Sequence, residues 1–124
     1  MTTTLDIQRK SIEDPSEVRD FEKGHIDLVA LGGTVFSRTV FQPGWHWAEH
    51  VKPLARTDSC EFLHRAYIAS GTLHVKMDNG TELDLVAGDV ATISPGHDGW
   101  VVGDEACVMY EFGGEDRDYG KPAD

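Results

Sequence analysis

Apolar and polar residues alternate with a period of two along most of the chain beyond residue 24. Alternation of this kind, in runs rich in β-branched and aromatic residues, indicates strands that bury one face. The pattern predicts strands over residues 25–31, 34–41, 45–51, 61–69, 72–77, 81–86, 90–93, 100–102 and 106–112. Glycine and proline stand at most breaks between these runs, where they favour turns.

Two local signals refine this pattern. Asp78-Asn79-Gly80 lies between two alternating runs, and asparagine and glycine accept the positive φ of a tight turn, so the sequence predicts a β-hairpin here. Near the start, Asp14-Pro15-Ser16-Glu17 offers a capping residue, a proline for the first helical position and an early acidic residue. These residues predict one helical turn that runs to Arg19.

Regularly spaced strands with at most one short helix predict an all-β fold, an antiparallel sandwich or barrel. The length of 124 residues fits a single domain. Within it we expect N-terminal strands and a connector over residues 1–32, a barrel core over 33–112 and a polar tail over 113–124.

The chain is strongly acidic, with 22 Asp and Glu against 11 Lys and Arg and a formal net charge of −11. This charge repels phosphates and anionic lipids, so we expect neither nucleic acid nor a membrane as a partner. The sequence shows no signal-peptide pattern. It also has no apolar run that approaches the length of about 20 residues needed for a membrane helix. Cys60 and Cys107 form neither a disulfide framework nor a C-x-x-C motif, which favours a reducing, cytoplasmic location.

Glycine and histidine recur at regular intervals in the middle of the chain. Gly44 precedes His50 by six residues, and His64 precedes Gly71 by seven. These four residues resemble the first motif of the cupin superfamily, with His64 in the place of the motif's glutamate. Lys52 stands where the motif has its second histidine, and the interval from Lys52 to His64 is longer than usual.

A second group resembles the second cupin motif. Gly88 and Gly96 occupy its glycine positions, and Ser94 replaces its proline. Gly99 stands at its histidine position, two residues after His97. The chain is thus similar to a small single-domain cupin over residues 35–112. The resemblance implies a cupin-type antiparallel β-barrel, a jelly-roll-like double-stranded β-helix.

These residues favour a metal site. Imidazole is a common ligand of transition metals, and three protein ligands leave a coordination position for water or substrate. We predict His50, His64 and His97 as ligands, with the thiolate of Cys60 as a fourth. The cofactor would be a divalent transition metal ion, Zn, Fe, Ni or Mn, and the sulfur ligand favours zinc. Alternatively, His50 and His64 are hydrogen-bonded barrel residues, His97 lies in a pocket wall or a surface turn, and Cys60 is a small buried hydrophobe.

Large aromatic side chains accompany both motifs. Trp45, His46 and Trp47 precede the first predicted ligand, and Trp100 follows the second motif. Indole rings are flat and carry a hydrogen-bond donor, which suits the lining of a ligand pocket, so we predict these four as substrate-binding residues. The other interpretation of the tryptophans is packing in the core or at a dimer interface.

The resemblance implies a small metal-binding cupin that holds a small molecule in its barrel and, if it is an enzyme, one such as a dioxygenase or isomerase. The other hypothesis is a non-enzymatic ligand-binding or sensor barrel, in which Lys52 marks a degenerate metal site. Fold alone does not choose between the two, and no catalytic residue is predicted. Exposed barrel edges favour a homodimer.

Overall fold

The computed structural model describes residues 6–113, which form nine strands and two four-residue helices. The strands are β1 (Glu17–Phe21), β2 (Gly24–Leu31), β3 (Thr34–Phe41), β4 (His64–Ser70), β5 (Thr72–Met77), β6 (Glu82–Val86), β7 (Val90–Ile93), β8 (His97–Val101) and β9 (Cys107–Glu111). The helices are α1 (Trp47–His50) and α2 (Lys52–Ala55). The predicted polar tail, apart from Gly113, lies outside the described residues.

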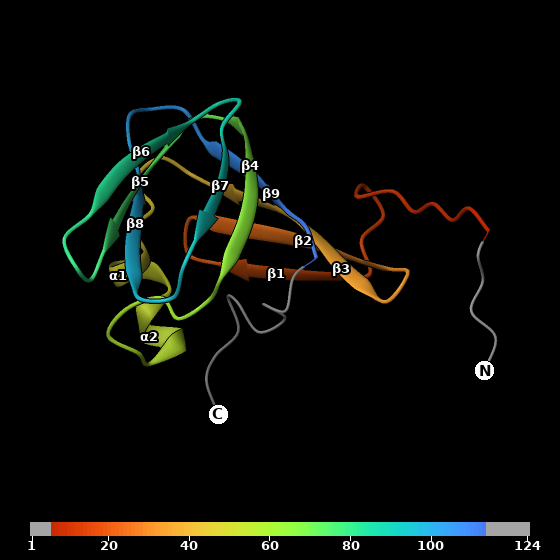
Figure 1. The fold of residues 1–124 in the computed structure, drawn as a ribbon, viewed down its shortest axis with the longest axis horizontal. Helices are drawn as coiled ribbons and strands as arrows, with labels where there is room; N and C mark the ends of the chain where they lie inside the picture. Colours follow the sequence, from red (N-terminus) through yellow and green to blue (C-terminus); the bar gives the residue numbers. More distant parts are fainter. Residues whose placement is uncertain (1–5, 114–124) are drawn as a thin grey trace.

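The strands form two antiparallel sheets. One has six strands in the order β1-β2-β3-β9-β4-β7, and the other has three in the order β6-β5-β8. Figure 1 shows the small sheet at one end of the molecule, with β1, β2 and β3 extending away from it. The predicted all-β fold with antiparallel, barrel-like sheets is therefore confirmed.

The predicted hairpin is also confirmed. β5 and β6 pair from Thr72↔Val86 to Lys76↔Glu82. The Met77 amide donates to the Thr81 carbonyl over 2.8 Å, and Gly80 adopts a φ of 95°, which residues with a Cβ rarely accept. Gly80, together with the Asn79 side chain, which accepts a hydrogen bond from the Thr81 amide over 3.0 Å, therefore fixes the register of β5 against β6.

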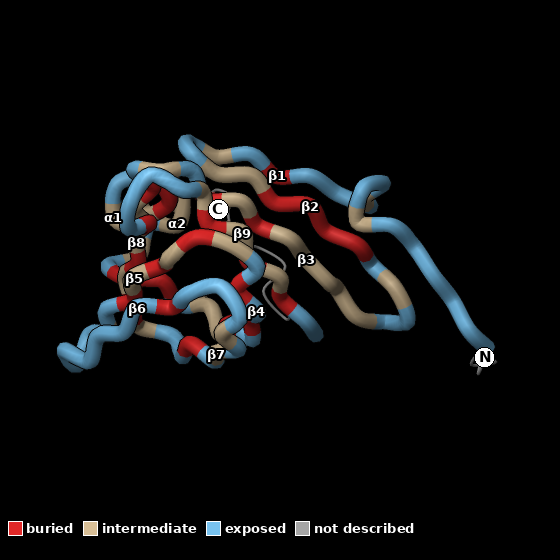
Figure 2. The backbone as a smooth tube through the Cα atoms, turned by 90° about the horizontal axis from the view of Figure 1, so that it is seen from above, coloured by how far each residue is buried: buried red, intermediate tan, exposed pale blue. Residues whose placement is uncertain are grey.

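The core lies between the two sheets, because alternate residues of both point inward. The large sheet contributes Phe41, Ile68 and Met109, and the small sheet contributes Leu73 and Val75. Figure 2 shows buried positions, and along β4, β8 and β9 they alternate with intermediate or exposed ones. Period-two burial against a facing sheet is what the sequence alternation predicts.

Two sequence predictions are wrong. The predicted helical turn over 14–19 is instead irregular backbone up to Ser16 followed by β1 from Glu17, and the Ser16 amide donates to the Leu28 carbonyl over 2.7 Å. The predicted strand over 45–51 is mostly helix α1, so the structure has two short helices rather than at most one. In both places, tertiary contacts override a local signal.

Within residues 6–113, no helix has the length and apolar character needed to cross a membrane.

Candidate metal centre

Two segments far apart in the sequence bring Cys60, His64 and His97 together. Cys60 lies in the loop between α2 and β4, four residues before His64, and the histidines are the first residues of β4 and β8. The loop is fixed to β8, because the Cys60 amide donates to the His97 carbonyl over 2.7 Å and the Gly96 amide donates to the Cys60 carbonyl over 2.7 Å. Backbone pairing therefore sets where the thiol lies.

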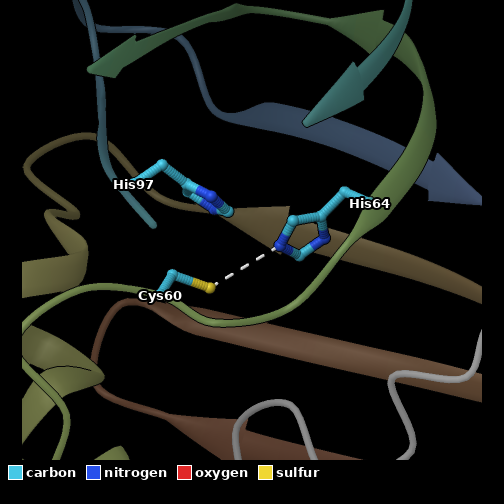
Figure 3. A group of neighbouring side chains, drawn as sticks. All are labelled: Cys60, His64 and His97. Carbon is cyan, nitrogen blue, oxygen red and sulfur yellow. Dashed lines mark hydrogen bonds between the residues drawn. The ribbon is translucent and has the colours of Figure 1, made fainter. Parts of the chain in front are cut away.

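The three side chains converge inside the barrel (Figure 3). One ligand atom from each lies within 4.8 Å of the others, and all three residues are buried. Sγ of Cys60 is 3.7 Å from Nε2 of His64. Two such ligands on one tetrahedral zinc ion would be about 3.6 Å apart, given bond lengths of about 2.3 and 2.05 Å. The spacing therefore fits a shared ion.

Both imidazoles are held at Nδ1. Nδ1 of His64 donates a hydrogen bond to the carboxylate of Glu111, and Nδ1 of His97 donates to the Ser94 carbonyl over 2.7 Å. A proton fixed on Nδ1 makes Nε2 the nitrogen that binds a metal. Metal-binding histidines commonly show this arrangement, in which a carboxylate or carbonyl orients the ring from the opposite side.

The cluster is polarised even without an ion. Burial alone would raise the pKa of Cys60, but hydrogen bonds from His64 and His97 lower it to about 7. Burial alone would lower the pKa of His64, but the Glu111 carboxylate and Cys60 raise it to about 10. At neutral pH the pair therefore tends toward thiolate and imidazolium, and a cation would replace the imidazolium proton.

A small cavity of about 20 Å³ adjoins the cluster, and His64, His97, Trp45 and Trp47 all line it. A volume of this size holds about one water molecule. Nε1 of Trp45 is buried and finds no hydrogen-bond partner among the described residues. A buried donor of this kind favours a polar atom as its neighbour, so the surroundings suit a single coordinated water or ligand oxygen.

The remaining predicted ligand, His50, is not part of this cluster among the described residues. It lies on α1, where its Nδ1 accepts a hydrogen bond from the His46 amide over 3.0 Å. Its Nε2 is 3.4 Å from a carboxylate oxygen of Glu22. Because residues 47–50 form a helix, the His50 imidazole contacts the His46 amide and Glu22 instead of joining the cluster.

The predicted substrate-binding residues divide between two places. Trp45 and Trp47 are buried at the small cavity. His46 and Trp100 lie 4.9 Å apart, ring to ring, and the alternation of β8 places Trp100 on the face of the small sheet away from the core. Nε2 of His46 donates to Asp98 over 2.7 Å. The structure does not bring these four residues into one pocket.

Sequence reasoning missed Glu111. It lies 47 residues after His64 but reaches it because β9 pairs with β4. One signal could have found it: Cys107, Met109 and Glu111 occupy alternate positions of one strand, so a carboxylate falls on the inward, buried face. A buried carboxylate needs a partner, and a histidine is a common one.

Neither a protein-family model nor a curated protein sequence matches this chain. Solved structures do. An RmlC-like cupin from Shewanella frigidimarina has a TM-score of 0.56 and 19% identity, with 83% of this chain and 87% of that one covered. A cupin-like protein from Thermotoga maritima has a TM-score of 0.53 and 19% identity, covering 90% of this chain and 82% of that one.

This chain has the cupin fold. The polyketide cyclase RemF from Streptomyces resistomycificus shares this fold with a TM-score of 0.60 and 15% identity, covering 88% of this chain and 80% of that one. The structural similarity establishes the cupin architecture. At identities this low, the function has to be inferred from the chemistry of the site. The candidate site of this chain comprises one thiol and two imidazoles inside the barrel.

Proposed function

We propose that this cupin binds a divalent transition metal, with zinc preferred, through Cys60, His64 and His97, and that the metal meets a small molecule at its fourth position. The observation that carries the proposal is the anchoring of both imidazoles at Nδ1, by Glu111 and by the Ser94 carbonyl. Sulfur with two imidazole nitrogens is a donor set that suits zinc over ions that prefer oxygen.

The side chains around the cluster have separate tasks in this proposal. Glu111 orients His64 and balances the charge of the site, and the backbone at Ser94 orients His97. Trp45 and Trp47 exclude bulk water, since both are buried against the small cavity. A bound metal would supply Lewis acidity, which polarises a substrate oxygen or lowers the pKa of water.

A second candidate is a non-enzymatic metal-holding or sensor barrel. The observation that favours it is the size of the cavity at the cluster, about 20 Å³, which takes a water molecule but no substrate as the side chains stand. Steady turnover would require movement of the wall. A metal-loaded protein that binds ligands without converting them would support this candidate.

Elemental analysis of the purified protein tests the metal proposal. We expect about one equivalent of transition metal per chain after dialysis against zinc. His64→Ala should lose most of it, whereas His74→Ala should keep it, since His74 lies on the outer face of β5 and bonds Glu82 and Asp84. Less than about a tenth of an equivalent in the unaltered protein, or equal loss in both variants, would refute the site.

We further propose a cytoplasmic homodimer. Cys60 and Cys107 are both free and buried, which fits a reducing compartment. Among the described strands, β1 and β7 pair on one side only in the large sheet, and an unpaired strand edge can pair with a second chain.

A further inference from the structure

A second, much larger hollow lies between the β5–β6 hairpin and β7. Its volume is about 620 Å³, within the range of small-molecule sites. It follows from the topology, because β6 is the end strand of the small sheet and β7 is an end strand of the large one. Figure 1 shows these two strands on the same side of the barrel. We call this hollow the β6–β7 groove.

The walls of the β6–β7 groove are mainly apolar. Its apolar lining includes Val75, Met77, Leu85, Val90, Ala91 and Ile93. Leu83 also lines it and is 64% exposed, and Val90 is 82% exposed. Large apolar side chains left open to water at a concave surface favour an apolar occupant, because covering them removes that surface from water.

The charges of the groove select among occupants. Of the residues that line it, Asp84 and Asp89 carry charge, and both are acidic. Asp84 bonds His74 over 2.7 Å, and Asp89 accepts a hydrogen bond from the Val86 amide over 2.8 Å, so each carboxylate is held in place. The whole chain carries a net charge of −11. His74, which bonds Asp84, lies on the outer face of β5, and the lining of the groove contains no Lys, Arg or His, so an anionic ligand would find no cationic side chain in the groove.

The groove and the metal centre share a wall. Val75 and Ile93 line both the groove and the small cavity that touches His64 and His97. Ile93 belongs to β7, which has four residues and pairs with β4 along one edge. A short strand with few pairing bonds is the part of the barrel that moves at least cost.

We propose that the β6–β7 groove binds a small molecule with an apolar body and a neutral or positively charged head group, and that this molecule reaches the metal centre past Val75 and Ile93. The second half rests on the proposed function; the first half does not need a metal. The shared wall, the apolar lining and the acidic charge together define the class of ligand.

Three probes that share one apolar body test the ligand class: 1-naphthylmethylamine, 1-naphthylmethanol and 1-naphthoate. Each is titrated into the metal-free protein while amide resonances are followed by NMR. We expect the amine and the alcohol to shift the amides of Thr81 and Thr92 in the groove, and the carboxylate to bind at least about tenfold more weakly. Equal binding of all three, or no shifts in the groove, would overturn the proposal.

A matched pair of variants locates the probe. Leu83 and Val86 are both exposed on β6, but only Leu83 belongs to the groove lining. Leu83→Ser should weaken binding of 1-naphthylmethylamine about fivefold, from lost apolar contact, and Val86→Ser should leave it unchanged. Equal weakening by both variants would overturn the location.

Loading with cobalt tests separately whether the ligand binds in the groove and whether it reaches the metal. In the protein loaded with Co²⁺, saturating 1-naphthylmethylamine should change the visible absorption of the metal, because that absorption reports its coordination. An unchanged spectrum in protein that binds both cobalt and the amine overturns the link between groove and metal. Failure of the proposed function has a different signature: no cobalt or zinc is taken up, while the amine still shifts the groove amides.

Discussion

The affinity of the cluster for zinc should depend on pH in a way that the structure specifies. Zinc needs the thiolate of Cys60 and the Nε2 lone pair of His64. Between about pH 7 and 10 the metal-free protein already has the thiolate, since the pKa of Cys60 is about 7. It still carries the imidazolium proton, since the pKa of His64 is about 10. Each zinc ion must therefore displace one proton from His64.

The magnitude follows from this proton count. Release of one proton makes the dissociation constant fall tenfold for each unit of pH, about 1.4 kcal/mol. From pH 7.5 to 8.5 the affinity should thus rise about tenfold. Below about pH 7 Cys60 also holds a proton, so the dependence should steepen toward two protons.

Competition with a fluorescent zinc chelator measures this dependence, after correction for the chelator's own protonation and for zinc hydroxide. Proton release into a weakly buffered indicator solution gives an independent count. Glu111→Gln is the control, because loss of the carboxylate removes a main cause of the raised His64 pKa and should flatten the slope above pH 7.5. The same variant should bind zinc about 10- to 100-fold more weakly. A dissociation constant independent of pH above 7.5, with no proton released, would refute the reasoning.

Three further outcomes are expected. In urea titrations with chelator present, the free energy of unfolding should fall by about 1 kcal/mol from pH 9 to 10. The raised pKa of His64 stabilises the folded protein, and this stabilisation is lost as the pH rises through that pKa. Glu111→Gln should show a smaller fall. Gly71→Ala should cost about 3 kcal/mol, since its Cβ would lie 2.4 Å from the Ala106 carbonyl, whereas Gly80→Ala, with open space around it, should cost about 1 kcal/mol from backbone strain alone. Light scattering should report twice the mass of one chain, and a monomer at tens of micromolar would reject the dimer.

Alternation and turn residues predict a strand of this protein well where its pairing partner is close in sequence and its buried face is apolar. The β5–β6 hairpin needs only an Asn-Gly turn and two alternating runs, all between Thr72 and Val86. β1 is not evident from the sequence because its two apolar residues, Val18 and Phe21, fall on opposite faces of a strand and its central residue is Arg19, so its short run shows no apolar face. Pairing with β2, rather than its own composition, makes it a strand.

The candidate site was predictable only as far as the cupin motifs extend. His64 and His97 stand at or near motif positions, and Cys60 was near His64 in sequence. His50 matched the motif as well, yet α1 forms there, because Trp47 and Val51 both pack in the core one helical turn apart. The predicted strand rested on the alternation of Trp45 and Trp47, which indicates a strand, and not on the spacing of four between Trp47 and Val51, which indicates a helix. Glu111 depends on strand order, which spacing does not reveal.

The departures from the cupin motif and the presence of a thiol at the site have one cause. Had the predicted strand over 45–51 formed and continued to residue 52, the alternate side chains at positions 50 and 52 would share one face. Instead α1 and α2 occupy 47–50 and 52–55, so His50 bonds the His46 amide and Lys52 begins a second helix. The loop beyond α2 then returns to pair with β8 at His97, and this pairing carries Cys60 to His64. In the proposed site a soft sulfur donor would take the place of an imidazole, which favours zinc among zinc, iron, nickel and manganese.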